Sequence, residues 1–135
     1  MHQTITAMVE THPTEIRYDR QLLEECIAAC AECAQACTSC AEACLSETHV
    51  DPLRRCIRAN LDCADLCATT ARVLTRHASY GEDALLGLVL AACAEACRAC
   101  GDECASHAEM HRHCEVCAGA CRRCAEACER LLATL

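Results

Sequence analysis

The sequence contains no phenylalanine and no tryptophan. These side chains normally supply much of the area buried in a small core, so this interior must be completed in another way. Hydrophobic residues still make up 53% of the 135 positions, but cysteine and alanine account for most of them. A core of such small side chains buries little apolar area per residue. A metal held only by the folded chain would add its binding free energy to folding, so the composition favours a metal-binding protein.

Three further features are missing. First, the chain has no excess of basic residues. Its net charge of −8 argues against nucleic acid or an anionic membrane surface as a partner. Residues 1–10 lack the basic stretch and apolar stretch of a secretory signal. No apolar run approaches the roughly 18 residues of a membrane span. We therefore expect a cytoplasmic chain without a membrane partner, whose length fits one folded domain.

Cysteine is the residue that the chain has in excess, with 18 copies. The six cysteines of residues 26–44 are separated by four, three, four, three and four positions, which is the a/d rhythm of a heptad. On a helix, all six thiols would face one side. The same rhythm recurs in three later segments. The full set is Cys26, Cys30, Cys33, Cys37, Cys40, Cys44, Cys56, Cys63, Cys67, Cys93, Cys97, Cys100, Cys104, Cys114, Cys117, Cys121, Cys124 and Cys128.

These segments predict an all-α chain. The first long helix is expected from an N-cap at Asp19 to Cys44, and the second from Asp51 and Pro52 to about His77. The third follows a turn at 78–81, and the fourth follows a turn within 105–112, with capping boxes expected at Ser79 and Ser106. Short connections predict an antiparallel up-down-up-down four-helix bundle with a cysteine-lined core over 19–135. Residues 1–18 would form an extension, with a short amphipathic helix before the proline at 13.

The predicted topology separates two ends of the bundle. Leucines gather at one end and would plug it: Leu23, Leu74, Leu86, Leu90, Leu131 and Leu135. The other end, which we call the mouth, would collect four cysteines and three histidines: Cys44, Cys56, Cys104, Cys114, His107, His111 and His113. The remaining four histidines, at positions 2, 12, 49 and 77, are assigned no role.

Thiolates select soft metals, which leaves Cu(I), Zn(II) and iron–sulfur clusters as candidates. A zinc ion with four thiolates carries two negative charges, so four such sites would bury about eight, at a prohibitive desolvation cost. If each thiolate bridges Cu(I) ions, the ratio approaches about one ion per cysteine and the core is nearly neutral. The charge balance therefore favours copper.

Two alternatives remain open. An iron–sulfur protein is disfavoured because its usual C-x2-C-x2-C-x3-C-P run wraps a loop, whereas here the spacing alternates along a helix. A thiol-redox protein or disulfide scaffold is disfavoured because neighbouring thiols on one helix point in nearly parallel directions.

The cysteine stripes of all four helices and the histidines near one end resemble the copper storage proteins, specifically the cytosolic type. The resemblance covers nearly the whole chain from Asp19. It implies that many Cu(I) ions lie along the bundle axis, that all eighteen cysteines bind them, and that His107, His111 and His113 assist at the mouth. It also implies loading through the mouth, assembly as a homotetramer, and sequestration, detoxification or supply of copper to a chaperone or apo-enzyme rather than catalysis.

Two positions depart from a simple stripe. Asn60 stands where the rhythm of the second helix calls for cysteine, and three interpretations are open: a weak metal contact, a hydrogen bond to a thiolate, or a buried residue that fixes helix register. Met110 lies among the mouth histidines, where it is either a thioether ligand or an exposed loop residue.

Overall fold

The computed structural model describes residues 2–135, so Met1, the first residue of the predicted extension, lies outside the described part. Residues 2–135 form five α-helices and one short 3-10 helix and contain no strand. The elements are α1 (His2–Glu10), α2 (Arg20–Leu45), η1 (Asp51–Leu53), α3 (Arg54–His77), α4 (Asp83–Ala105) and α5 (Arg112–Leu132). The predicted all-α class is confirmed.

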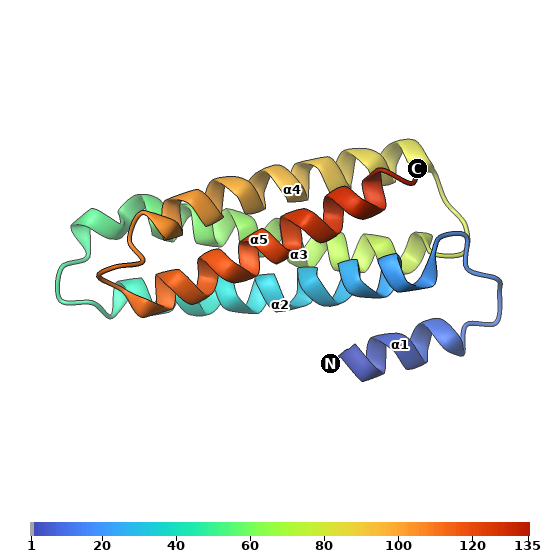
Figure 1. Ribbon diagram of the computed structural model, residues 1–135, viewed down its shortest axis with the longest axis horizontal. Coiled ribbons are helices and arrows are strands. Elements are labelled where there is room, and N and C mark those ends of the chain that lie inside the picture. Colours follow the sequence, from blue (N-terminus) through green and yellow to red (C-terminus); the bar gives the residue numbers. More distant parts are fainter. Residues whose placement is uncertain (1) are drawn as a thin grey trace.

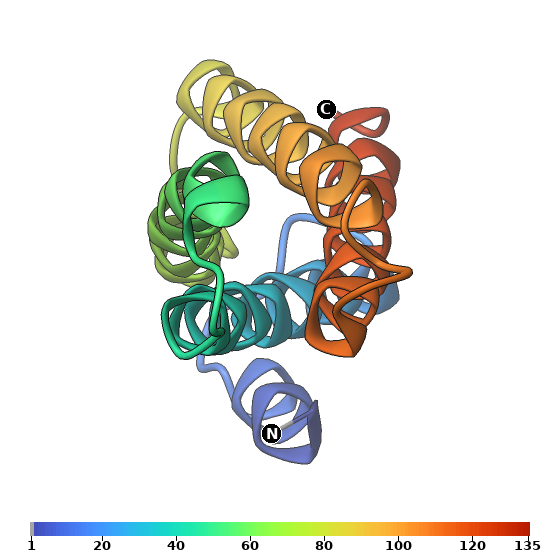
Figure 2. The same ribbon diagram turned by 90° about the vertical axis from the view of Figure 1, so that its left-hand side faces the viewer.

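The four long helices form one bundle (Figure 1). Helix α2 packs against α3 and α5, and α4 packs against the same two helices on the opposite side. Seen from the mouth, the four helices surround a common axis (Figure 2). Successive helices run in opposite directions, as expected for connections of only a few residues, and the predicted up-down-up-down topology is confirmed.

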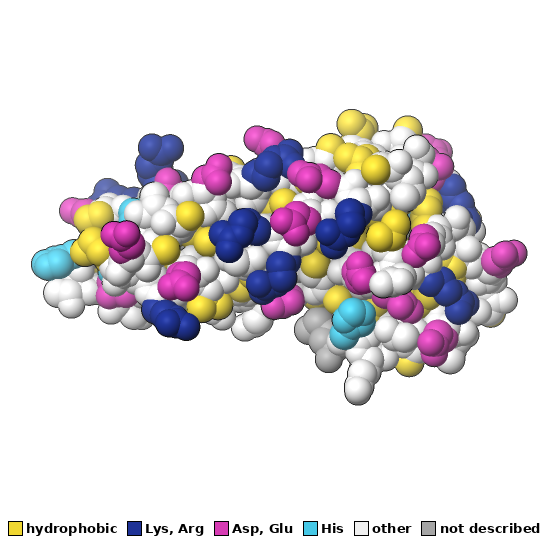
Figure 3. All heavy atoms as spheres, in the orientation of Figure 1, with side chains coloured by type: hydrophobic (Ala, Val, Ile, Leu, Met, Phe, Trp, Pro, Cys, Tyr) yellow, Lys and Arg dark blue, Asp and Glu magenta, His cyan; other side chains and the backbone are white. Residues whose placement is uncertain are grey.

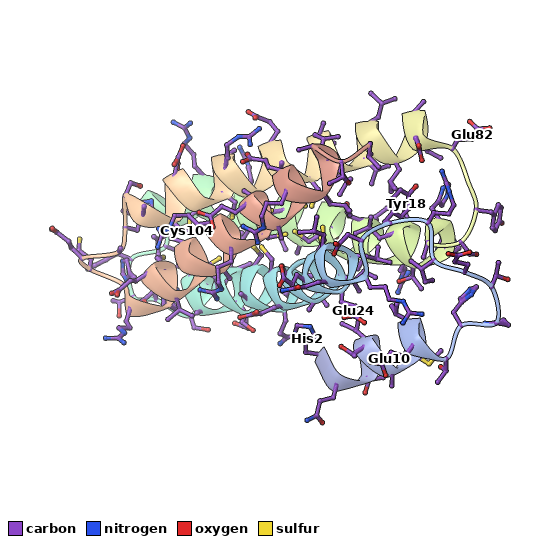
Figure 4. The ribbon with its side chains drawn as sticks, turned by 45° about the vertical axis from the view of Figure 1, so that its right-hand side comes forward. His2, Glu10, Tyr18, Glu24, Glu82 and Cys104 are labelled. Carbon is purple, nitrogen blue, oxygen red and sulfur yellow. The ribbon has the colours of Figure 1, made fainter. Side chains whose placement is uncertain are left out.

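Helix α1 lies outside this bundle and packs against α2 (Figures 1 and 2). Its Val9 side chain is buried, whereas Met8 is exposed. The segment that leads from α1 to α2 is hydrogen-bonded to the first residue of α4. The Arg17 side chain and the Tyr18 hydroxyl both donate to Asp83 Oδ1 over 2.7 Å, and Figure 4 shows Tyr18 in this segment. These contacts hold the pKa of Asp83 below its ordinary value, with the Tyr18 hydrogen bond as the main cause.

The predicted helix ends were only partly right. Asp19 caps α2 as predicted, since its carboxylate accepts the Leu22 N–H over 3.0 Å. Within the described chain, no side chain caps η1, α3, α4 or α5. The N-cap positions of α4 and α5 are Glu82 and His111, so both predicted capping boxes were wrong. Ser106 instead ends α4, where its hydroxyl donates to the Glu103 carbonyl over 2.6 Å.

The end opposite the mouth is closed by leucine. Five of the six predicted side chains are fully buried there, namely Leu23, Leu74, Leu86, Leu90 and Leu131. Leu135 is 39% exposed, because α5 ends at Leu132 and Leu135 follows in the terminal turn. The closed end therefore has a compact apolar core that does not depend on sulfur.

His77, which was assigned no role from the sequence, is partly buried at the C-terminal end of α3. Its Nδ1 atom is buried and has no hydrogen-bond partner among residues 2–135. The ring stacks on Tyr80 and lies against Gly81, where an added Cβ atom would be 2.2 Å from Nδ1. Gly81 also has a φ of +132°, which side-chain-bearing residues rarely adopt. Glycine is thus required here for two separate reasons.

Gly81→Ala is expected to lower the free energy of unfolding of the metal-free protein by about 1–3 kcal/mol, because the backbone would be strained and His77 displaced. Gly119→Ala is the matched control. Gly119 lies within α5, and an added Cβ there would first meet the flexible Arg123 side chain at 3.4 Å. This control should stabilise the protein by about 0.5–1 kcal/mol. Urea denaturation in reductant measures both values, and equal shifts for the two variants would contradict the assignment.

The outer surface is mostly charged, with acidic and basic side chains interspersed on the face seen in Figure 3. Glu32 pairs with Arg123 over 3.0 Å, and Glu95 pairs with Arg98 over 2.9 Å. Helix α4 is the one helix in residues 2–135 that is long and apolar enough to cross a membrane by length and composition. This is weak evidence for a membrane span, because core helices of soluble proteins have the same composition. Leu86, Leu90 and the cysteines of α4 are buried in the bundle.

Candidate metal centre

The cysteine stripes face inward on all four bundle helices. All eighteen thiols are buried and free of disulfide bonds. In Figure 4 sulfur atoms lie between the bundle helices, with Cys104 towards the mouth. The inward orientation predicted from the spacing is confirmed, and the disfavoured alternative of a disulfide scaffold is not observed.

The sulfur atoms are spaced suitably for a shared metal. Close pairs are separated by 3.5 Å between Cys67 and Cys97, 3.7 Å between Cys37 and Cys117, and 3.9 Å between Cys30 and Cys128. Thiolates at about 2.3 Å from a metal lie roughly 3.8–4.0 Å apart in tetrahedral or trigonal coordination. The sulfur network therefore needs only small side-chain adjustments to place a soft ion among three or four thiolates.

Of the groups of side chains that could hold a metal ion, three mark successive positions along the axis. Within each group the potential ligand atoms all lie within 4.8 Å of one another. The deep cluster, nearest the leucine end, consists of Cys30, Cys93, Cys124 and Cys128. The central cluster consists of Cys37, Cys100, Cys117 and Cys121. The mouth cluster consists of Cys40, Cys44, His113 and Cys114. Further cysteines, such as Cys33, Cys63 and Cys67, connect them, so the potential sites form a continuous series.

Asn60 is fully buried within this series. Its Oδ1 atom accepts hydrogen bonds from Cys100 at 3.1 Å, Cys104 at 3.3 Å and Cys117 at 3.4 Å. Its Nδ2 atom donates to Cys56 at 3.8 Å. Of the three interpretations of Asn60, hydrogen bonding to sulfur is the one that these contacts support.

The three mouth histidines are arranged differently from one another. His113 alone belongs to the mouth cluster, with its Nδ1 atom 3.4 Å from Cys40 Sγ and 3.6 Å from Cys114 Sγ. His111 lies beside it, with the ring centroids 5.6 Å apart. His107 is hydrogen-bonded through Nε2 to Glu103 at 2.8 Å. Met110 is 84% exposed, which agrees with an exposed loop residue.

Two carboxylates hold these histidines, and the sequence analysis missed both. Glu47 Oε2 lies 2.9 Å from His113 Nε2 and 3.0 Å from His111 Nδ1. These contacts, chiefly the one with His113, keep the pKa of Glu47 below its ordinary value. Glu103 and His107 are four residues apart, on α4 and in the turn that follows it, so their spacing could have revealed the pair. Glu47 and His113 are 66 positions apart, and no local pattern connects them.

The mouth thiols differ in acidity. Burial raises the pKa of Cys44 to about 11, and negative charge on Cys56 acts in the same direction. Burial likewise raises the pKa of Cys114. A hydrogen bond from Cys104 lowers the pKa of Cys56. A metal that binds at this end must displace the protons of the thiols that hold it.

The sequence profile of the Csp family, described as copper storage protein, matches residues 19–133. The chain belongs to the copper storage protein family. The resemblance drawn from the cysteine stripes is therefore confirmed. The family is one of storage proteins and is not defined by a catalysed reaction.

Solved copper storage proteins share the fold. The copper storage protein Ccsp from Streptomyces lividans, loaded with 10 copper equivalents, is 52% identical with a TM-score of 0.93, over 97% of this chain and 99% of that one. A further solved structure that matches is that of a cytosolic copper storage protein from Streptomyces lividans. The Cu(I)-bound copper storage protein BsCsp3 is 38% identical with a TM-score of 0.73, over 82% of this chain and 98% of that one.

A curated bacterial relative also matches. The uncharacterized cysteine-rich protein YhjQ of Bacillus subtilis (strain 168) is 39% identical over 98 residues, which is 73% of this chain and 84% of that protein. The copper storage proteins Ccsp and BsCsp3 thus share the bundle described above, and the cysteine clusters of this member are able to hold several ions.

Proposed function

We propose that this copper storage protein holds many Cu(I) ions along the axis of its bundle, bound by the eighteen cysteines. The observation that carries the proposal is the continuous series of buried free thiols from the deep cluster to the mouth cluster. Residues 19–135 would form the storage domain, and residues 1–18 an extension that packs on its outside. The ions are the stored cargo, and no step of catalysis is required.

The charge of the core supports Cu(I) over Zn(II). The sulfur spacing alone suits either ion, because both bind thiolates at similar distances. Filling the core with tetrathiolate zinc would bury two negative charges per ion. Among residues 2–135 the buried polar side chains are Asn60 and Thr70, and neither is cationic. A monovalent ion that shares thiolates leaves the interior nearly neutral. This balance allows the whole length of the series to fill.

Loading through the mouth is the route that the fold favours. The opposite end is closed by buried leucine, whereas the mouth brings His113 against Cys40 and Cys114. We propose His107, His111 and His113 as loading groups rather than as main storage ligands. Cytoplasmic location, assembly as a homotetramer, and exchange with a copper chaperone or an apo-enzyme complete the proposal, for sequestration, detoxification or supply.

Anaerobic titration with Cu(I) in the presence of a competing chelator tests the storage function. Because shared thiolates allow about one ion per cysteine, the fully reduced protein should withdraw more than about ten ions before free chelator complex accumulates. Prior alkylation of the thiols, in denaturant, is the control and should abolish uptake. Saturation at a few equivalents, or isolation of the protein with iron and sulfide, would contradict storage and favour an iron–sulfur or thiol-redox protein.

A further inference from the structure

Glu47 lies at the mouth, immediately after the residue that ends α2. Its backbone N–H donates to the Cys44 carbonyl over 3.2 Å, which ties it to the segment that delivers a mouth thiol. Its side chain reaches the beginning of α5. There a single oxygen, Oε2, contacts both His111 Nδ1 at 3.0 Å and His113 Nε2 at 2.9 Å.

The chemistry of these contacts fixes the proton on His113. An ionised carboxylate can only accept hydrogen bonds, so the ring nitrogen that faces it must carry hydrogen. The metal-binding form of histidine is the neutral imidazole, which has one N–H and one lone pair. With the hydrogen on Nε2, the lone pair is on Nδ1. This is the atom that lies 3.4 Å from Cys40 Sγ and 3.6 Å from Cys114 Sγ.

We propose that Glu47 is a positioning residue for copper uptake, which holds His113 in the Nε2–H tautomer with its Nδ1 lone pair directed into the mouth cluster. An incoming Cu(I) ion then meets a nitrogen lone pair beside two thiols without waiting for the ring to turn or change tautomer. This inference rests on the proposed storage function. Carboxylates that orient metal-binding histidines commonly act in this way.

The other mouth histidines lack this combination of contacts. His111 presents Nδ1 to Glu47, and His107 presents Nε2 to Glu103, which also lies 3.9 Å from Arg55. Among the three, in the described structure, His113 is the one with a carboxylate on one nitrogen and sulfur beside the other. Glu47 is therefore expected to act through His113.

The tautomer is measured first, in the metal-free protein, by long-range ¹H–¹⁵N correlation spectra of the histidine rings, with His113 assigned by its loss in His113→Gln. The native protein should show the Nε2–H form. Glu47→Ala should show a mixture of both tautomers. His111→Ala, which retains the contact between Glu47 and His113, should keep the native tautomer. An unchanged tautomer in Glu47→Ala would overturn the proposal.

Uptake is measured second, by anaerobic stopped-flow transfer of Cu(I) from its bicinchoninate complex. The first phase should be about ten-fold slower in Glu47→Ala, with the total uptake unchanged. Glu115→Ala is the matched control, because it removes an exposed carboxylate from the first turn of α5 and should keep the native rate. A native rate in Glu47→Ala would overturn the proposal. If the native protein itself took up few ions, the storage function would fail instead, while the copper-free tautomer comparison would stand.

Discussion

Replacing the four cysteines of the central cluster by alanine is expected to remove about four Cu(I) ions from the capacity of the protein, since shared thiolates allow about one ion per cysteine. The loss should be local, because the deep cluster and the mouth cluster keep their own ligand atoms within 4.8 Å of one another. Far-UV circular dichroism should still report helices, because alanine favours the helical state and the leucine end is untouched. Anaerobic titration against a chelator measures the capacity.

The matched comparison is the same replacement in the deep cluster. It removes the same number of thiols from a position nearer the leucine end and should lower the capacity by a similar amount. A loss that is confined to one of the two variants would mean that the clusters are not equivalent stores. An unchanged capacity in both variants would contradict storage in the bundle axis.

Leu90→Ala is expected to lower the free energy of unfolding of the metal-free protein by about 2–5 kcal/mol. Leu90 is fully buried at the closed end, and the neighbouring leucines leave few ways to fill the cavity. Cysteine and alanine bury little area elsewhere, so a large share of the metal-free stability should come from these leucines. Urea denaturation in reductant and without copper measures the change.

Leu88→Ala provides the control, because Leu88 is on the same helix but 72% exposed. Its effect should be within about 0.5 kcal/mol of zero. Copper should raise the resistance to unfolding of both Leu90→Ala and the native protein, because metal bound by the folded state adds its binding free energy to each. Equal destabilisation by the two variants would show that the leucine end does not support the metal-free bundle.

The bundle could be predicted from the sequence because its signal is periodic. Spacings of four and three positions repeat through all four segments, and such a pattern places one face of each helix inward whatever the residue type. The positions of the connections followed from where the pattern stops. Even the unusual Asn60 could be located as a core residue, because it occupies a stripe position, although three of its hydrogen bonds to sulfur depend on two other helices, α4 and α5.

The helix ends and the arrangement of the mouth were less predictable. Ser79 and Ser106 fit a capping pattern, but the chain continues past each of them before the next helix begins. The sequence predicted three histidines at the mouth but could not distinguish their roles, because these roles depend on contacts across the bundle. Glu47 contacts His113, which lies in a distant part of the chain, and this contact exists only after α2 and α5 pack together.

Copper-edge anomalous scattering from crystals of the anaerobically loaded protein tests the central claim most directly. If Cu(I) is stored along the bundle axis, copper peaks should form a series from the deep cluster to the mouth cluster, each beside two or three cysteine sulfurs. Copper peaks confined to the outer surface would contradict it. A few four-sulfur centres that scatter at the zinc edge, with the remaining thiols empty, would contradict it equally.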